Sequence, residues 1–531
     1  MPSCRRAVVP SAVPRSAFLG GGVITDTGYV TDIDYPDYFH SQMSPLLLSS
    51  LCRLAGFDAV RPEPGFTYLE LGAGAGMTTA VLAAANPEGR FVGTDFNPRH
   101  IAAGTQMIRA AGLTNASFLE CGFADLAEGK VALPAFDYVA LSGVYSWVDA
   151  EQREHVLTIL DRHVKPGGVV YINYNAMPGW AVSAPLQRLI LEYSEALDGG
   201  VLHRLSATRE WVDRLVHADG RFFSSHEAAL RPRLDSFGQW ADGYVAHEFI
   251  NRGWQALFHT DVARAVAGAG LEFAGSVSPV RPLRRTPEQR KLFEGITDRA
   301  LREVVADFLD DTQFREDVYV RQPRRLSPRE RGEWCDEVGL CLTERRGAMH
   351  LHTVSSRLLN PLLDALEQRP MTFTEIAQVP AFSGLSMAAV VAFGERLTAE
   401  GWTSPYLRSA QANSAEPAWR LNRVLAERAQ TAAPQSAHYA LASPVISSGV
   451  PLNFIQAQVY LALTGDDPGL GADTVERVLA RLHDCDIQVE ISGNAVKRSS
   501  EVTRAEAVDI LHAIRDSRVP VWRRLRVLAG E

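Results

Sequence analysis

Residues 66–98 constrain the fold of this 531-residue chain more than any other stretch. Residues 67–71 form a short run of apolar, aromatic and β-branched residues that stops at a cluster of glycines, which is typical of a buried strand. The glycines occupy alternate positions: Gly72, Gly74 and Gly76. A segment of helical composition follows, and a second strand then ends at Asp95. The order strand, glycine loop, helix, strand and acid predicts a nucleotide-binding half-unit of an α/β fold.

The spacing of the glycines distinguishes between ligands. The dinucleotide-binding fingerprint requires glycines at its first, third and sixth positions, but the sixth position here is Met77. The chain instead has Glu70-x-Gly72-x-Gly74-x-Gly76, which resembles motif I of the class I S-adenosylmethionine (SAM) methyltransferases. The resemblance implies that Glu70 and the glycines surround the methionine part of SAM, and that Asp95 holds the ribose hydroxyls. A glycine turn without a ligand and a NAD site are the less favoured alternatives.

Charge and cysteine usage exclude several classes of function. The net charge of −9 gives no general reason to expect nucleic acid or an anionic membrane as a partner. The six cysteines are scattered without a CxxC pair, so we expect neither a metal site nor a disulfide framework, and a reducing compartment fits. No stretch reaches the roughly 18 apolar residues of a membrane span. The chain is therefore predicted to be soluble and cytoplasmic.

The region before the first strand is rich in aromatic residues. Residues 1–28 are predicted to be a disordered leader, because prolines interrupt any continuous apolar run. Tyr29, Tyr35, Tyr38 and Phe39 follow. Tyrosines before a SAM-binding fold often form a lid over the cofactor, whereas simple packing beside the sheet is the alternative. We take Tyr38 as the best single candidate for a cofactor contact.

Further cofactor contacts are expected where later strands end. Phe96 follows Asp95 directly, and the turn after the strand at residues 116–120 carries an apolar ring and an acid, Phe123 and Asp125, that suit adenine. Ser142 ends the strand predicted at residues 136–142. Because open α/β sheets bind ligands at the carboxyl ends of their strands, these side chains are expected to meet there.

Amides and aromatic residues lie at or just after the ends of the strands predicted at residues 136–142 and 169–174, where the acceptor of the methyl group is expected. An amine acceptor must lose a proton and then be held by hydroxyl, amide or carbonyl oxygens, with rings stabilising residual positive charge. We predict that four residues handle the proton: Tyr145, Asn173, Tyr174 and Asn175. Trp147 and Trp180 are expected to contact the substrate. No strong base stands among them, which favours an amine over an alcohol or a phenol.

Several longer motifs narrow the resemblance. The motifs GVYSWV, KPGG and YNAMPGW, with residues 244–251 and 314–321, closely resemble methyltransferases that carry a methyltransferase regulatory domain, a group that includes rickettsial protein-lysine methyltransferases. The similarity covers residues 29–325. It implies a protein or peptide substrate, with lysine favoured, and a substrate contact by His247. The loop sequence GAGAG and Ser142 depart from the pattern of this group, and cofactor binding is expected to survive both.

The predicted fold class is α/β: a Rossmann-like, seven-stranded class I methyltransferase sheet with a helical insertion, followed by winged-helix-like and small helical domains. The core is expected at residues 29–182 and 256–325 and the insertion at 183–255. A connector and the winged-helix-like unit are expected at 326–410, and the C-terminal helical domain at 411–531. The would-be recognition helix carries only Arg396 as a basic residue, which argues against DNA binding.

The sequence therefore predicts a SAM-dependent N-methyltransferase that acts on a protein or peptide side chain and releases S-adenosylhomocysteine. The alternatives are a small-molecule or natural-product N- or O-methyltransferase, and a SAM-binding regulator that contacts DNA. Neither nucleic acid nor membrane is expected as a partner, and a homodimer is left open. The sequence names neither the acceptor nor the number of methyl groups added.

Overall fold

The computed structural model describes residues 37–529, apart from residues 219, 278–284, 347–355, 433–436, 466, 486 and 492–494. The predicted leader, Tyr29 and Tyr35 lie outside the described residues. Within the described part, no helix is long and apolar enough to cross a membrane. The five cysteines described there are buried and free of disulfides.

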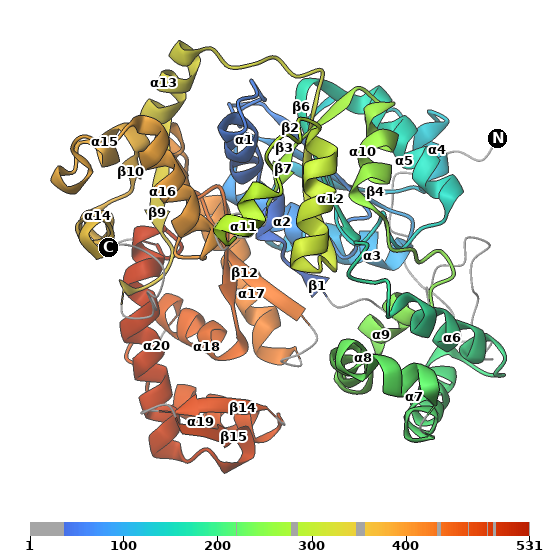
Figure 1. Ribbon diagram of the computed structural model, residues 1–531. Helices are drawn as coiled ribbons and strands as arrows, with labels where there is room; N and C mark the ends of the chain where they lie inside the picture. The colour runs from blue at the N-terminus through green and yellow to red at the C-terminus, as the bar shows by residue number, and fades with distance from the viewer. Residues whose placement is uncertain are drawn as a thin grey trace.

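A seven-stranded sheet with the order β4-β3-β2-β5-β6-β8-β7 forms the centre of the molecule, which confirms the predicted fold class (Figure 1). Its strands are β2 (Thr67–Leu71), β3 (Arg90–Asp95), β4 (Ala116–Glu120), β5 (Phe136–Leu141), β6 (Val164–Asn175), β7 (Leu271–Ser276) and β8 (Phe314–Arg321). β8 is antiparallel to both of its neighbours, and the other pairings are parallel. The strand order reverses between β2 and β5, so a crevice for a ligand is expected outside their carboxyl ends.

Both faces of the sheet are buried under helices. Tyr68, Tyr138 and Tyr171 face α1 (Pro45–Leu54) and α2 (Met77–Ala85), whereas Leu69 and Ile172 face α5 (Ala150–His163) and α10 (His259–Ala267). Side chains alternate between faces along a strand, so neighbouring residues belong to different cores. α3 (Pro98–Ala110) and α4 (Phe123–Ala127) complete the layers.

Four helices form the insertion after β6: α6 (Ala184–Glu195), α7 (Val201–His217), α8 (Arg221–Gln239) and α9 (Asp242–Phe249). They make a lobe beside the sheet in Figure 1 with its own apolar core, which includes Leu186, Ile190 and Val245. The chain then returns through α10 and β7 to α11 (Pro287–Lys291), α12 (Arg299–Asp310) and β8, which closes the sheet. Residues 314–321, part of the segment predicted to belong to the core, thus supply the strand β8.

The unit predicted to be winged-helix-like has a different strand connection. α14 (Ser356–Gln368), α15 (Phe373–Ala377) and α16 (Met387–Ala399) pack on a small sheet with the order β10-β9-β11. Its strands are β9 (Val338–Leu342), β10 (Met371–Thr372) and β11 (Thr403–Leu407). The middle strand β9 follows α13 (Pro328–Glu337) and precedes the three helices, so β11 pairs with a strand from earlier in the chain. No wing hairpin follows α16 in the described residues.

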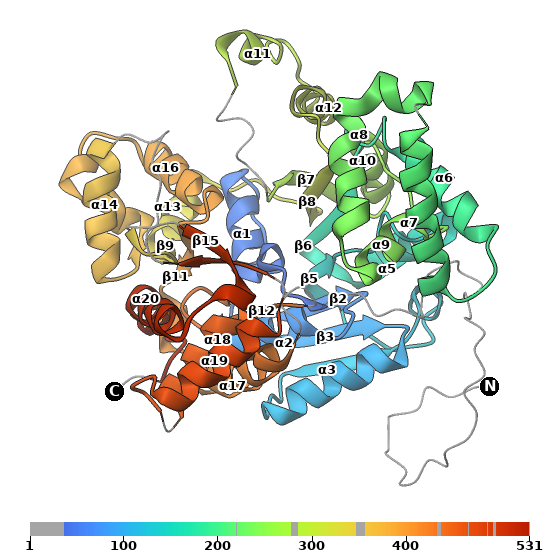
Figure 2. The ribbon, with the colours of Figure 1, turned by 90° about the horizontal axis from the view of Figure 1, so that it is seen from below.

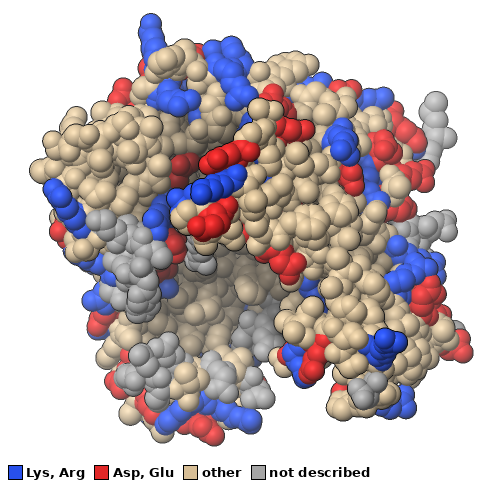
Figure 3. All heavy atoms as spheres, in the orientation of Figure 1, with Lys and Arg blue, Asp and Glu red and all other residues tan. Residues whose placement is uncertain are grey.

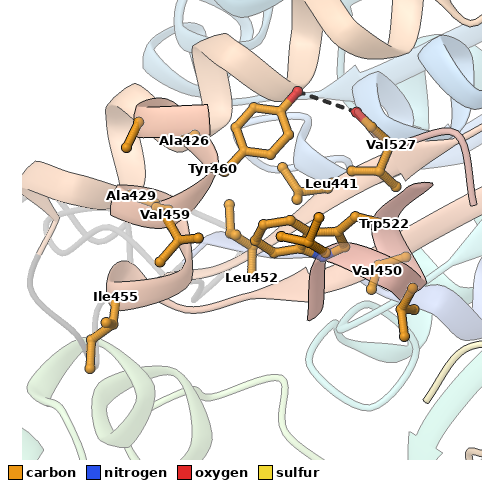
Figure 4. Close-up of a cluster of buried hydrophobic side chains, with 14 of the residues drawn as sticks. Ala426, Ala429, Leu441, Val450, Leu452, Ile455, Val459, Tyr460, Trp522 and Val527 are labelled. Atoms are coloured by element: carbon orange, nitrogen blue, oxygen red, sulfur yellow. Dashed lines mark hydrogen bonds between the residues drawn. The ribbon is translucent and has the colours of Figure 1, made fainter. Parts of the chain in front are cut away.

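The C-terminal domain is not purely helical, which corrects the prediction. It contains α17 (Glu416–Thr431), α18 (Phe454–Thr464), α19 (Ala472–His483) and α20 (Arg504–Arg524), together with the hairpins β12 (Ala437–Ser443)–β13 (Ser448–Leu452) and β14 (Gln488–Ile491)–β15 (Ala495–Arg498). Tyr460 and Trp522 pack in its core, and the Tyr460 hydroxyl donates to the carbonyl of Val527 (Figure 4).

The first helix of the C-terminal domain, α17, lies beside α2 and α3 (Figure 2). Ala418, Leu421 and Leu425 of α17 share one apolar cluster with Met77 and Val81 of α2. The C-terminal domain is thus packed against the helix that begins at the glycine loop.

Candidate cofactor and substrate site

The glycine loop connects β2 to α2, and each of its three glycines has a positive φ, which favours glycine. A Cβ at Gly76 would lie 2.3 Å from the Phe118 ring, and one at Gly72 would lie 2.6 Å from the Val144 side chain. A Cβ at Gly74 would meet nothing within 4 Å. Gly72 and Gly76 therefore allow close packing under the loop, whereas Gly74 borders open space.

Glu70 lies beneath this loop. Its carboxylate is 4% exposed and accepts a hydrogen bond from the hydroxyl of Thr79 in α2. Burial raises the pKa of Glu70 from 4.5 to about 7, against the opposite effect of the bonds from Thr79. The hydrogen bond from Thr79 thus connects Glu70 of β2 to α2. It lies beneath the loop where Glu70 is predicted to contact the cofactor.

Asp95 ends β3 and is held by the glycine loop. Its Oδ2 atom accepts the Gly74 N–H at 2.9 Å. Its Oδ1 atom accepts the Asn97 N–H at 2.8 Å and lies 3.2 Å from Nδ1 of His100. The Phe96 ring beside it is 43% exposed, which is unusual for a large apolar side chain next to a buried acid. An acid in a fixed position and an exposed ring are what a ribose and a base require.

Open space recurs at the ends of the neighbouring strands. A Cβ at Gly122, after β4, or at Gly143, after β5, would meet nothing within 4 Å. The Asn173 amide supports the second of these turns: its Oδ1 atom accepts the Gly143 N–H at 2.9 Å and its Nδ2 atom donates to Ser142 Oγ at 2.8 Å. With Gly74, these positions border a cradle that a cofactor with a nucleoside and an amino-acid part fits.

The two residues predicted to grip adenine differ in their surroundings. Phe123 is half-buried and packs against the core beneath α4. Asp125 is 45% exposed and forms an ion pair with Lys130 at 3.0 Å. Since this pair lies at the surface, Asp125 is the less suitable of the two for a base.

A buried glutamate that sequence reasoning set aside lies where β5 and β6 end. Glu248 of α9 accepts three side-chain N–H groups: Trp147 Nε1 at 3.0 Å, Asn175 Nδ2 at 2.9 Å and Trp254 Nε1 at 3.3 Å. It is 3% exposed, and burial raises its pKa. Asn251 Nδ2 also donates to the Trp147 carbonyl at 2.8 Å. The insertion is thereby fastened to both strand ends, at the predicted substrate residue Trp147 and the predicted proton-handling residue Asn175.

Two further tryptophans, Trp180 and Trp254, lie near Glu248. Together with Trp147 they form what we call the aromatic wall. Trp180 is 1% exposed, donates its Nε1–H to the Gln313 carbonyl at 3.0 Å and packs edge-on against Trp254 with ring centroids 4.6 Å apart. The Arg233 guanidinium of α8 lies 3.7 Å from the centre of the Trp180 ring, a cation–π contact. His247 is buried in α9 next to Glu248.

Two of the four predicted proton-handling residues, Tyr145 and Tyr174, lie in the apolar core of the sheet. Tyr174 lies on the other face of β6, where its hydroxyl donates to Asp317 Oδ2 at 2.6 Å and lies 3.3 Å from His259. Tyr145 is buried in the cluster under α5, and burial raises its pKa to about 12. Alternation along the strand explains Tyr174, because Asn173 and Asn175 occupy the opposite face. We therefore assign packing roles to both tyrosines.

Tyr38 lies in β1 (Asp37–Tyr38), next to the start of α2. Its carbonyl accepts the hydroxyl of Thr78 at 3.3 Å, and burial raises the pKa of its phenol. Among the described residues, no group of three His, Cys, Asp or Glu side chains is placed to hold a metal ion.

Comparisons with known proteins agree with this geometry. The model of a methyltransferase domain family matches residues 69–170, and that of a predicted methyltransferase regulatory domain matches residues 241–321. A relative from Synechocystis, described as an uncharacterized protein, is 28% identical over 82% of this chain and 87% of its own length. An uncharacterized Rickettsia prowazekii protein is 24% identical over 56% of this chain and 53% of its own length.

Solved structures show the same fold. PKMT2 from Rickettsia typhi has a TM-score of 0.64 at 16% identity, over 93% of this chain and 99% of its own. The structure of PKMT2 in complex with AdoHcy gives 0.63 over the same shares. The glycine cradle and Asp95 suit the same class of cofactor. The chain therefore has a methyltransferase domain over residues 69–170 and a methyltransferase regulatory domain over residues 241–321, and its fold is that of a SAM-dependent methyltransferase.

Proposed function

We propose that this enzyme methylates an amine on a protein or peptide side chain, with lysine as the favoured target. The buried carboxylate of Glu248 carries the proposal. Its three direct hydrogen-bond partners are neutral N–H groups, and the Arg233 charge acts on it as a more distant influence. A negative charge in a low-dielectric place favours a cation at the ends of β5 and β6.

The aromatic wall supports the same class of acceptor. Trp180 already packs against one cation, the Arg233 guanidinium. Tryptophan faces attract ammonium groups, so the half-buried Trp147 and Trp254 suit a lysine side chain and the positive charge that remains while its nitrogen forms a new bond, whereas the buried Trp180 supports them.

The residues of the chain have three tasks in this reaction. SAM, when bound, supplies a methyl group on a positively charged sulfur. The glycine loop and Asp95 would hold it, with Phe96 and Phe123 as candidates for the base and Ser142 at the turn that Asn173 supports. Asn175 and Trp147, fixed by Glu248, orient the acceptor and exclude water. An amine loses its proton to water before it binds, so no strong base is required.

A mass-spectrometric assay tests the proposal. Purified enzyme is incubated with isotopically labelled SAM and three pools: lysine-containing proteins, the same proteins with their lysines chemically acetylated beforehand, and a mixture of small amines and alcohols. We expect label on lysine in the first pool and a strong loss in the second. Label only in the third pool would favour the small-molecule alternative, and protein labelling that is unchanged by acetylation would exclude lysine.

A further inference from the structure

The segment before α1 adds a strand to the C-terminal domain. β1 pairs in parallel with β12, with Tyr38 opposite His438, and the Phe39 N–H donates to the His438 carbonyl at 3.0 Å. The Tyr38 and His438 rings stack with centroids 4.5 Å apart and planes 23° apart. Backbone and side-chain contacts thus both fasten Tyr38 to β12.

The same segment is fastened to the cofactor loop on its other side. The Thr78 hydroxyl donates to the Tyr38 carbonyl at 3.3 Å and accepts the His40 N–H at 3.1 Å. Thr78 is the second residue of α2, directly after Gly76 and Met77. One hydroxyl therefore holds two backbone groups of this segment beside the end of the glycine loop.

Packing makes the three parts one unit. A Cβ at Gly449 in β13 would lie 2.8 Å from the Phe39 ring and 2.9 Å from the Val81 side chain of α2. The Ser44 hydroxyl and the Asn86 amide both donate to the Ser447 carbonyl in the β12–β13 turn, each at 3.2 Å. Movement of the hairpin would therefore move both the segment and α2.

We propose that the C-terminal domain positions Tyr38 beside the cofactor loop, with His438 as the positioning residue, and thereby sets the affinity for the cofactor. The C-terminal domain is then part of the cofactor-binding unit and not a separate module that only recognises the substrate. Figure 1 shows β1 beside β12, at the edge of the small sheet β1-β12-β13. The proposal rests on SAM as the cofactor and is independent of the identity of the methyl acceptor.

Two measurements on the full chain test the proposal, and neither needs an acceptor. The first is the calorimetric affinity for S-adenosylhomocysteine, and the second is hydrogen–deuterium exchange of residues 37–44. The variants are His438→Ala, His438→Phe, Tyr38→Ala and Thr78→Val. His512→Ala, on α20 of the same domain, is the matched control because it removes an imidazole far along the chain from β12.

We expect His438→Ala to weaken binding about fivefold, the size of one aromatic pair, and to raise exchange at residues 37–44. Tyr38→Ala should do the same, whereas His438→Phe keeps a ring against Tyr38 and should restore most of the affinity lost in His438→Ala. Thr78→Val combined with His438→Ala should cost less than the sum of the two changes. Faster exchange with unchanged affinity would overturn the proposal, as would unchanged exchange or an equal loss of affinity in His512→Ala.

Discussion

Glu70→Gln provides a direct test of the charge buried beneath the glycine loop. The substituted amide keeps an oxygen that can accept the Thr79 hydroxyl, so the main change is the loss of an ionisable group. In the wild type, burial raises the pKa of Glu70 from 4.5 to about 7 in the folded state. Between these two values the folded protein therefore binds more protons than the unfolded chain does.

The sign of the effect follows from proton linkage. Because the pKa of Glu70 is higher in the folded state than in the unfolded chain, the folded state is more stable when Glu70 is protonated. The free energy of unfolding therefore falls as the pH rises from 4.5 to about 7. The pKa difference corresponds to about 3 kcal/mol of unfolding free energy, as an order of magnitude. Relative to the wild type, Glu70→Gln should gain about this amount between pH 4.5 and pH 8.

Urea unfolding of both proteins at several pH values measures this gain, because all other titrating groups cancel in the difference. Glu63→Gln, an exposed carboxylate near the start of β2, is the control and should show almost no pH-dependent difference. A wild-type-to-variant difference that stays constant from pH 4.5 to 8 would refute the reasoning, since Glu70 would then ionise at its ordinary pKa despite its burial.

The other predictions concern the same end of the sheet. Asp95→Ala should weaken S-adenosylhomocysteine binding about 10- to 100-fold, as expected for lost hydrogen bonds to a charged group. Unchanged binding in calorimetry would show that Asp95 does not contact the cofactor. Glu248→Gln should lower the unfolding free energy by about 2–4 kcal/mol, because its NH₂ group would face N–H donors; an unchanged melting temperature would contradict this. Gly76→Ala should destabilise the fold through contact with Phe118, whereas Gly74→Ala should reduce cofactor affinity more than it reduces stability. Unfolding and calorimetric titration of both variants test this, and equal effects of the two substitutions on stability and affinity would contradict it.

Local patterns in the sequence were sufficient for the parts of the fold that depend on neighbouring residues. The strand at residues 67–71, the glycine loop and the acid at the end of β3 are all specified within one stretch. α17 also carries a local pattern: Ala418, Leu421, Leu425 and Ala429 recur at helical spacing, and arginine and glutamate residues on the rest of the helix make its overall composition polar.

Contacts between distant segments account for what the sequence did not predict. The role of Glu248 depends on donors about 70 and 100 residues earlier, Asn175 and Trp147, so no local spacing reveals it. The middle strand of the small sheet, β9, precedes the helices that it supports, and a pattern of helices followed by one strand suggested a wing. Tyr174 is different, because strict alternation with Asn173 and Asn175 already placed it on the other face.

The insertion and the C-terminal domain attach to the cofactor end of the sheet from two sides. Glu248 fastens the insertion to the ends of β5 and β6, whereas β12, β13 and α17 fasten the C-terminal domain to the helix after the glycine loop. Figure 3 shows the surface hollowed between the lobe with α18–α20 and the lobe with α7–α9. Because each lobe is joined to a different half of the site, a change in their separation would act on the loop and on the strand ends together. A long acceptor that touches both lobes would therefore be sensed at the cofactor end, and a small amine would not.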